Sequence, residues 1–131
     1  MIVDTSALLA ILLGEPEADR FTLAIGHAAH PRMSAVSYLE AGIRVDRLGS
    51  PEASAALDEL LGRLRIAIEP VTVQQAHFAR VAYRRYGKSF HPAALNLGDC
   101  FSYALSQATG ELCPAQIWAL RQSAGGYVPQ P

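Results

Sequence analysis

The N-terminal stretch that decides the fold class of this chain is Met1-Ile2-Val3-Asp4-Thr5-Ser6-Ala7. Three apolar residues followed by Asp-Thr-Ser are typical of a short buried strand that ends at a helix cap. Two more short strands are expected at residues 32–34 and 66–68, and helices separate the three strands. Short strands that alternate with longer helices predict an α/β sandwich around a parallel sheet, whose ligands bind at the carboxyl ends of the strands. Asp4 lies at such an end.

Helices are expected where apolar residues recur at a spacing of three to four. Their expected ranges are 6–13, 16–26, 36–48, 52–64, 73–86 and 99–109. An exposed loop is expected between the last two. The core-facing positions expected in the third helix are Val36, Leu39, Ile43 and Leu48. The core-facing positions expected in the fifth helix are Ala76, Ala79, Val81 and Tyr83.

The composition fits one compact domain, residues 1–131, without a membrane anchor. Half of the 131 residues are apolar, and a chain of this size buries roughly two-thirds of its unfolded surface. No apolar run approaches the roughly 20 residues that span a bilayer, and the start lacks the basic region of a signal peptide. Cys100 and Cys113 have no CxxC spacing, which argues against a zinc site or a disulfide framework. We therefore expect a cytoplasmic protein.

Three acidic residues, Asp4, Glu40 and Asp99, each interrupt an otherwise apolar stretch. A carboxylate that faces a core is costly unless a cation or hydrogen-bond donors satisfy it. Three carboxylates in one crevice would repel one another, and a bound cation is the usual remedy. Oxygen ligands without accompanying thiolates or imidazoles favour Mg²⁺, with Mn²⁺ as the alternative. The pattern therefore points to metal-assisted phosphate chemistry.

Each of these acids also has a structural explanation. Asp4 is a suitable cap for the helix that follows it, and Ser6 either caps the same helix or donates to a carboxylate of the site. Asp99 can interact favourably with the dipole of the helix that it opens. Glu40 can form an ion pair with Arg44 one turn later. These alternatives stay open at the level of the sequence.

Positive charge is concentrated in one segment, although the net charge of the chain is only −1. No acid lies between Glu69 and Asp99. The residues in this segment that we expect to contact an RNA backbone are Arg84, Arg85, Lys88 and His91. A solvated helix face is the alternative interpretation. The aromatic residues that either stack on unpaired bases or pack in the core are Tyr83, Tyr86 and Phe90.

Resemblance to PIN-domain toxins of the VapC type is carried by residues 1–7 (MIVDTSA), 33–40 (MSAVSYLE) and 86–104 (YGKSFHPAALNLGDCFSYA). It covers roughly residues 1–110. It implies a three-layer α/β/α sandwich with a short central parallel sheet. Asp4, Glu40 and Asp99 match the family's first three acids, which are catalytic and bind the metal. Thr5 and Ser6, which follow Asp4, are expected to support these acids.

The same resemblance implies an activity and its partners. Similar proteins are Mg²⁺-dependent endoribonucleases, the toxins of bacterial type II toxin–antitoxin pairs. They cleave structured RNA such as tRNA, are commonly homodimers, and are silenced by a cognate VapB-type antitoxin. We therefore expect this chain to be such a toxin.

The resemblance ends abruptly after Gly110. Similar toxins continue with an apolar strand and a Lys-Gly-Asn/Asp-Asp-Phe motif that supplies a fourth acid, whereas here no acid follows Glu111. Glu111 is not at the motif position, so we do not count it as a ligand. Pro114 disfavours a central strand, so disrupted C-terminal strands, a short helix at 115–122 and a mobile tail are expected. The abrupt end indicates a shifted reading frame or an altered sequence after Gly110.

Two other functions are compatible with the sequence. Loss of the fourth acid would weaken metal binding and leave a catalytically impaired PIN domain that acts mainly as an antitoxin-binding module. A phosphoacceptor receiver-like domain has a similar size and an Asp at a strand end. It lacks the adjacent acidic pair expected near that Asp, so it is the weaker alternative.

Overall fold

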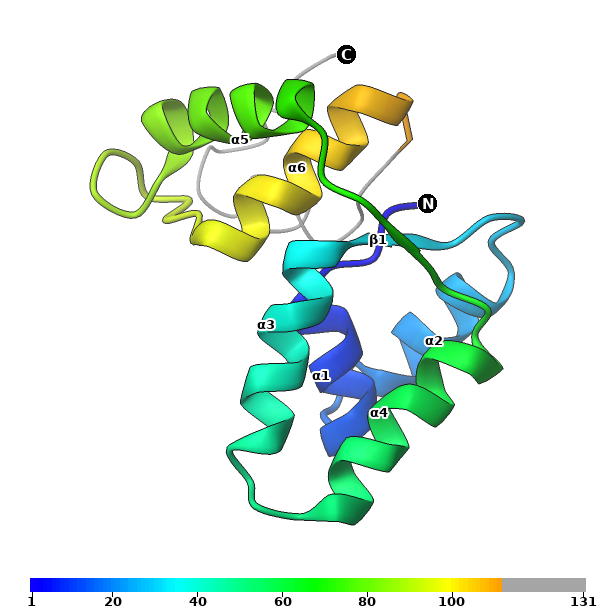
Figure 1. Cartoon of the computed structure of the whole chain (residues 1–131). Helices are drawn as coiled ribbons and strands as arrows, with labels where there is room; N and C mark the ends of the chain where they lie inside the picture. The colour runs from blue at the N-terminus through cyan, green and yellow to red at the C-terminus, as the bar shows by residue number, and fades with distance from the viewer. Residues whose placement is uncertain (112–131) are drawn as a thin grey trace.

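A short parallel sheet separates two groups of helices in the computed structural model, which describes residues 1–111 (Figure 1). Strand β1 (Arg32–Ser34) pairs in parallel with β2 (Ala67–Glu69). On the other side of β1, Ile2 forms a parallel bridge with Arg32, and the Val3 N–H donates to the Arg32 carbonyl oxygen at 2.7 Å. The first expected strand is thus reduced to a bridge, and the third lies one residue later than expected. The predicted α/β class is confirmed.

Six helices lie within the described residues, and most of their ends follow from capping side chains. They are α1 (Thr5–Leu13), α2 (Ala18–Gly26), α3 (Ala35–Asp46), α4 (Pro51–Arg63), α5 (Val73–Tyr86) and α6 (Leu97–Thr109). Helix α6 begins two residues earlier than expected because Asn96 is its N-cap and accepts a hydrogen bond from the Asp99 N–H. Gly14 and Gly110 end α1 and α6 with left-handed φ angles of 67° and 70°.

Each face of the sheet has its own apolar cluster. Figure 1 shows α5 and α6 on one side of β1 and helices α1 to α4 on the other. Val3 and Met33 point into the cluster formed with α1 to α4. A second cluster joins α5 to α6, and Ile2 packs against Leu105 of α6. The residues of the second cluster are Ala79, Ala82, Leu95, Cys100 and Ala104.

The expected inner face of α3 is wrong. Leu39, Ile43 and Leu48 are 59%, 46% and 59% exposed, whereas the buried positions of the helix are Ser37, Ala41 and Val45. Small side chains on this face let α3 lie close to α1 and α6 at the same time, and large apolar side chains would hold the helices apart. The position of α3 is therefore set by close packing, while its large apolar residues remain at the surface.

The expected inner face of α5 is also only partly right. Ala79 is buried as expected, but Ala76 is exposed, and Val81 and Tyr83 are 45% and 36% exposed. Gln75 and Ala82 are the other buried positions. Small residues again make the closest contact, here between α5 and α6.

Part of the sequence lies outside the described residues. This applies to residues 112–131, and hence to Cys113, the expected helix at 115–122 and the expected tail. Within residues 1–111, none of the helices is long and apolar enough to cross a membrane.

Candidate functional site

Asp4 precedes α1, Glu40 lies on α3 and Asp99 lies on α6, and α3 packs against both α1 and α6 (Figure 1). Asp4 is the N-cap of α1, at the carboxyl end of the first bridge-forming segment. Glu40 lies in the middle of α3, and Asp99 lies in the first turn of α6. The fold thus brings to one region three acids that are far apart in the sequence.

Asp4 is buried, with only 5% of its surface exposed. Its carboxylate accepts hydrogen bonds from the N–H of Ala7 at 3.0 Å and from the hydroxyl of Ser6 at 3.1 and 3.2 Å. Burial, together with a smaller effect of the negative charge of Asp99, raises the pKa of Asp4 from 3.8 to about 6. None of the ion pairs within residues 1–111 involves Asp4. Asp4 therefore caps α1 and is also a buried acid without a cationic partner in the described part of the chain.

Glu40 is half-buried and lies between α1 and α6. The Thr5 hydroxyl donates to Oε2 of Glu40 at 3.1 Å and also approaches the Ser37 carbonyl oxygen at 3.0 Å. A Cβ atom built on Gly98 would lie 1.8 Å from the same Oε2, so the Glu40 carboxylate rests directly against the start of α6. The ion pairs found within residues 1–111 do not include one between Glu40 and Arg44.

Asp99 takes part in a reciprocal capping box at the start of α6. Its Oδ2 accepts from the Asn96 N–H at 2.9 Å, and its own N–H donates to Asn96 Oδ1 at 2.9 Å. Asp99 therefore has a structural role at the start of α6. The same carboxylate raises the pKa of Asp4, so Asp99 also contributes to the electrostatics of the site.

A pair of buried hydroxyls beneath the acids was not predicted from the sequence. Ser37 Oγ and Ser102 Oγ lie 2.9 Å apart and are fully buried, and Ser37 Oγ also donates to the Gly98 carbonyl oxygen at 3.4 Å. The only signal available was that Ser37 precedes Glu40 by one helical turn. These serines join α3 to α6 next to Glu40.

The donor chemistry of the three acids fits a hard divalent cation. Asp4 and Asp99 repel each other in a region of low solvent access, and a cation would relieve the cost of burying Asp4. The present side-chain positions do not form a closed cage: within residues 1–111, no three His, Cys, Asp or Glu side chains are placed to hold one ion together. Asp99 is bonded to Asn96, and Glu40 is bonded to Thr5.

The basic segment divides into exposed and packed residues. Arg84, Arg85 and Lys88 are exposed. His91 is half-buried, its Nδ1 accepts from the Ala93 N–H at 3.0 Å, and its ring lies edge-on to Tyr86 at 5.4 Å. His91 therefore helps to shape the loop between α5 and α6, and only its other ring nitrogen remains for an outside contact.

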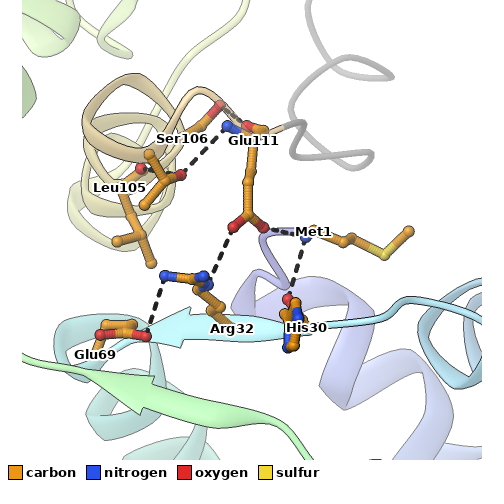
Figure 2. Close-up of polar contacts among 8 residues, drawn as sticks. Met1, His30, Arg32, Glu69, Leu105, Ser106 and Glu111 are labelled. Carbon is orange, nitrogen blue, oxygen red and sulfur yellow. Dashed lines mark hydrogen bonds and ion pairs between the residues drawn. The ribbon is translucent and has the colours of Figure 1, made fainter.

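Glu111 lies away from Asp4, at the amino ends of the strands. Figure 2 shows its carboxylate pointing toward the amino group of Met1 and the guanidinium of Arg32. The contact with Arg32 Nε is 3.1 Å, and Arg32 also pairs with Glu69 at 3.6 Å. Glu111 thus ties the end of α6 to the N-terminus and to β1, and Arg32 links β1 in turn to β2.

Comparison with known proteins relates this chain to one domain family and to several ribonucleases. The model of the PIN domain matches residues 1–112. The chain is 51% identical over 107 residues to ribonuclease VapC28 of Mycobacterium tuberculosis, with 81% of this chain and 80% of that protein covered. It is 48% identical over 112 residues to ribonuclease VapC42 of the same species, with 85% and 86% covered. A ribonuclease VapC of Mycolicibacterium smegmatis is 47% identical over 112 residues, again with 85% and 86% covered.

Proposed function

This chain belongs to the PIN-domain family and is a homologue of VapC ribonucleases, and on this premise we propose that it is the endoribonuclease toxin of a type II toxin–antitoxin pair. It hydrolyses structured RNA such as tRNA, in the cytoplasm, with Mg²⁺ or Mn²⁺ as cofactor. The observation that carries this proposal is the buried Asp4 carboxylate, whose pKa is raised to about 6 next to Asp99. A buried acid with a perturbed pKa and a second acid beside it is a recurrent feature of catalytic sites.

Asp4, Glu40 and Asp99 would hold the metal ion, and two hydroxyls support them. When bound, such an ion neutralises charge on the phosphodiester and activates a water molecule as the nucleophile. Ser6 donates to Asp4 and fixes the orientation of its carboxylate. Thr5 does the same for Glu40. These hydrogen bonds reduce the side-chain freedom that is lost when the acids bind a cation.

The exposed cations of the basic segment would position the RNA backbone. Arg84 and Arg85 lie in the last turn of α5, and Lys88 follows its C-cap in the loop that leads to the N-terminus of α6. Contacts from such residues fix register and orientation on RNA without reading bases. His91 would contribute through its other ring nitrogen.

A cognate VapB-type antitoxin inhibits the enzyme, and two copies of the chain form a homodimer.

Cleavage of a tRNA pool tests the enzyme assignment. Wild-type protein is expected to cut with Mg²⁺ or Mn²⁺ and to stop when EDTA is added. Asp4→Asn and Asp99→Asn should each abolish cutting, because they remove a charged ligand. Asp58→Asn, which removes an exposed acid on α4, is the matched control and should cut normally. Cutting by either of the first two variants at the wild-type rate would refute the assignment.

The second candidate is a catalytically impaired PIN domain that mainly binds its antitoxin. Two observations favour it: no acid follows Glu111 in the sequence, and no three acids within residues 1–111 close around a common point. This candidate predicts a stable complex with the antitoxin but no metal-dependent cleavage. Titration of Mn²⁺ into wild-type and Asp4→Asn protein separates the two, because only a working site gives binding that depends on Asp4.

A further inference from the structure

Phe90 is an exposed aromatic residue held in an ordered loop. It lies between α5 and α6, and 65% of its surface is accessible. Its ring packs edge-on against Tyr83, with 5.8 Å between centroids and 87° between planes, and Tyr83 is itself 36% exposed. The pair therefore presents an aromatic surface to solvent that the core of the α5–α6 cluster does not use.

Backbone hydrogen bonds fix the loop that carries Phe90. The Lys88 N–H donates to the Leu95 carbonyl oxygen at 3.2 Å, and the Leu95 N–H donates to that of Tyr86 at 2.9 Å. At the tip, the Phe90 N–H donates to the Gly87 carbonyl oxygen at 2.8 Å. Leu95 is only 2% exposed and anchors the base of the loop in the cluster. A ring held in this way loses little conformational freedom when it binds a ligand.

The surroundings of this aromatic pair are positively charged. Residues 70–98 contain no Asp or Glu. The exposed cations of this segment are Arg80, Arg84, Arg85 and Lys88. An aromatic surface flanked by positively charged side chains suits single-stranded nucleic acid, because the phosphates bind to the cations and the bases stack on the rings.

The loop also leads directly into the candidate site. Leu95 at its base is followed by Asn96, the N-cap of α6, and Asp99 lies one turn into that helix. Consecutive Cα atoms are about 3.8 Å apart, so the base of the loop lies within roughly 15 Å of Asp99. The loop that carries Phe90 therefore adjoins the start of the helix that bears Asp99.

We propose that Phe90, supported by Tyr83, is a stacking platform for an unpaired base of the RNA substrate. This inference rests on the proposed ribonuclease function and narrows its substrate class. The enzyme selects RNA that has an unpaired nucleotide close to the cleaved bond, such as the loop of a hairpin, over a continuous duplex.

Equilibrium binding to the Asp4→Asn full chain tests the platform, because this variant retains the loop and should not consume the RNA. The probes are a labelled RNA hairpin with an unpaired loop and a duplex of the same length. Phe90→Ala should weaken hairpin binding roughly 5- to 150-fold, the range expected for one stacked base, and leave duplex binding unchanged. Phe90→Tyr should retain hairpin binding.

Two controls separate stacking from other effects. Leu23→Ala removes an apolar residue of similar exposure, 62%, on α2 across the sheet, and should not change RNA binding. Phe90→Ala should leave the salt dependence of binding unchanged, whereas Arg85→Ala should lower its slope by about one. A 2-aminopurine base in the hairpin loop should lose fluorescence on binding only when an aromatic residue occupies position 90.

The possible outcomes distinguish this inference from the function on which it rests. Unchanged hairpin affinity in Phe90→Ala overturns the platform even if the wild type cuts RNA. An equal loss of affinity for the hairpin and the duplex in Phe90→Ala also overturns it. So does a loss of antitoxin binding with RNA binding unchanged, because Phe90 would then contact a protein and not a base. Binding that depends on Phe90 in a chain that never cuts RNA would support the platform and refute the nuclease.

Discussion

Replacement of Gly98 by alanine should separate catalysis from stability. Glycine at this position leaves room for the Glu40 carboxylate, since an added Cβ would lie 1.8 Å from Oε2 and 3.0 Å from Cδ. Side-chain Cβ atoms essentially never approach another heavy atom closer than 3.0 Å, so Oε2 must retreat by more than about 1 Å. Because Oε2 is the end of a flexible side chain, the carboxylate will move and the backbone will stay.

The expected effect on the two properties differs strongly. Alanine in a helix stabilises the folded state by about 0.5–1 kcal/mol relative to glycine. This gain offsets part of the free energy lost with the hydrogen bond between Thr5 and Glu40. The net change in unfolding free energy should therefore stay within about 1 kcal/mol. In activity, a displacement of about 1 Å in a catalytic group can cost about 100-fold. Gly98→Ala should thus fold normally and cleave RNA about 100 times more slowly.

The assay compares urea unfolding and single-turnover RNA cleavage in the same preparations. Gly62→Ala is the matched control, because this helical glycine has no heavy atom within 4 Å of an added Cβ. It should cleave RNA at the wild-type rate. In a Glu40→Ala background, Gly98→Ala should cost little further activity, since no carboxylate remains to be displaced. Wild-type cleavage by Gly98→Ala would refute the reasoning, as would a loss of activity explained by unfolding.

Three more outcomes follow from the geometry. Burial raises the pKa of Asp4 from 3.8 to about 6, so between these pH values the native state holds a proton that the unfolded chain releases. The contribution of the protonated Asp4 to the free energy of unfolding is therefore fully present below pH 4 and is lost as the pH rises through 6. Metal-free Asp4→Asn should lack this pH dependence, which amounts to about 3 kcal/mol. Urea unfolding of the wild type and of Asp4→Asn between pH 4 and 7 tests this, and the same pH dependence in both proteins would contradict it. Glu111→Gln should lower the unfolding free energy by no more than about 1 kcal/mol, since its ion pair with Arg32 is partly exposed, and should leave RNA cleavage unchanged; a lost activity would instead put Glu111 in the site. Ser102→Ala should cost about 1–2 kcal/mol in urea unfolding, because Ser37 loses its 2.9 Å partner in the core, and an unchanged midpoint would show that this pair is not stabilising.

The sequence was sufficient for the class of the fold and for the order of its elements, because helix caps and glycine stops are local signals. Helix α5 has the bounds that its apolar spacing predicts, and Gly14 and Gly110 end their helices as expected. The faces of the helices could not be predicted in the same way. Leu39 and Ile43 are exposed because α3 packs through Ser37 and Ala41, and helix packing distance is a property of both partners.

Only part of the candidate site could be predicted from the sequence. The positions of Asp4 and Asp99 at helix starts follow from local sequence, and their mutual repulsion follows from the fold. The contact of Glu40 with Gly98 joins residues 58 positions apart, and no pattern in one sequence indicates such a pair. The family resemblance included both Glu40 and Gly98, but it did not indicate that Gly98 leaves room for the Glu40 carboxylate.

The division of the apolar residues into two clusters has a consequence for how activity is lost. Asp4 and Glu40 belong to the body built on α1 to α4, whereas Asp99 belongs to the α5–α6 pair. Within the described residues, these bodies are joined through α6, which packs against α3 and β1 with contacts that include Ile2 with Leu105 and the two buried serines. Heat or mild denaturant that undocks the helical pair would silence the enzyme while the larger body remains folded, so inactivation should precede the loss of helical circular dichroism.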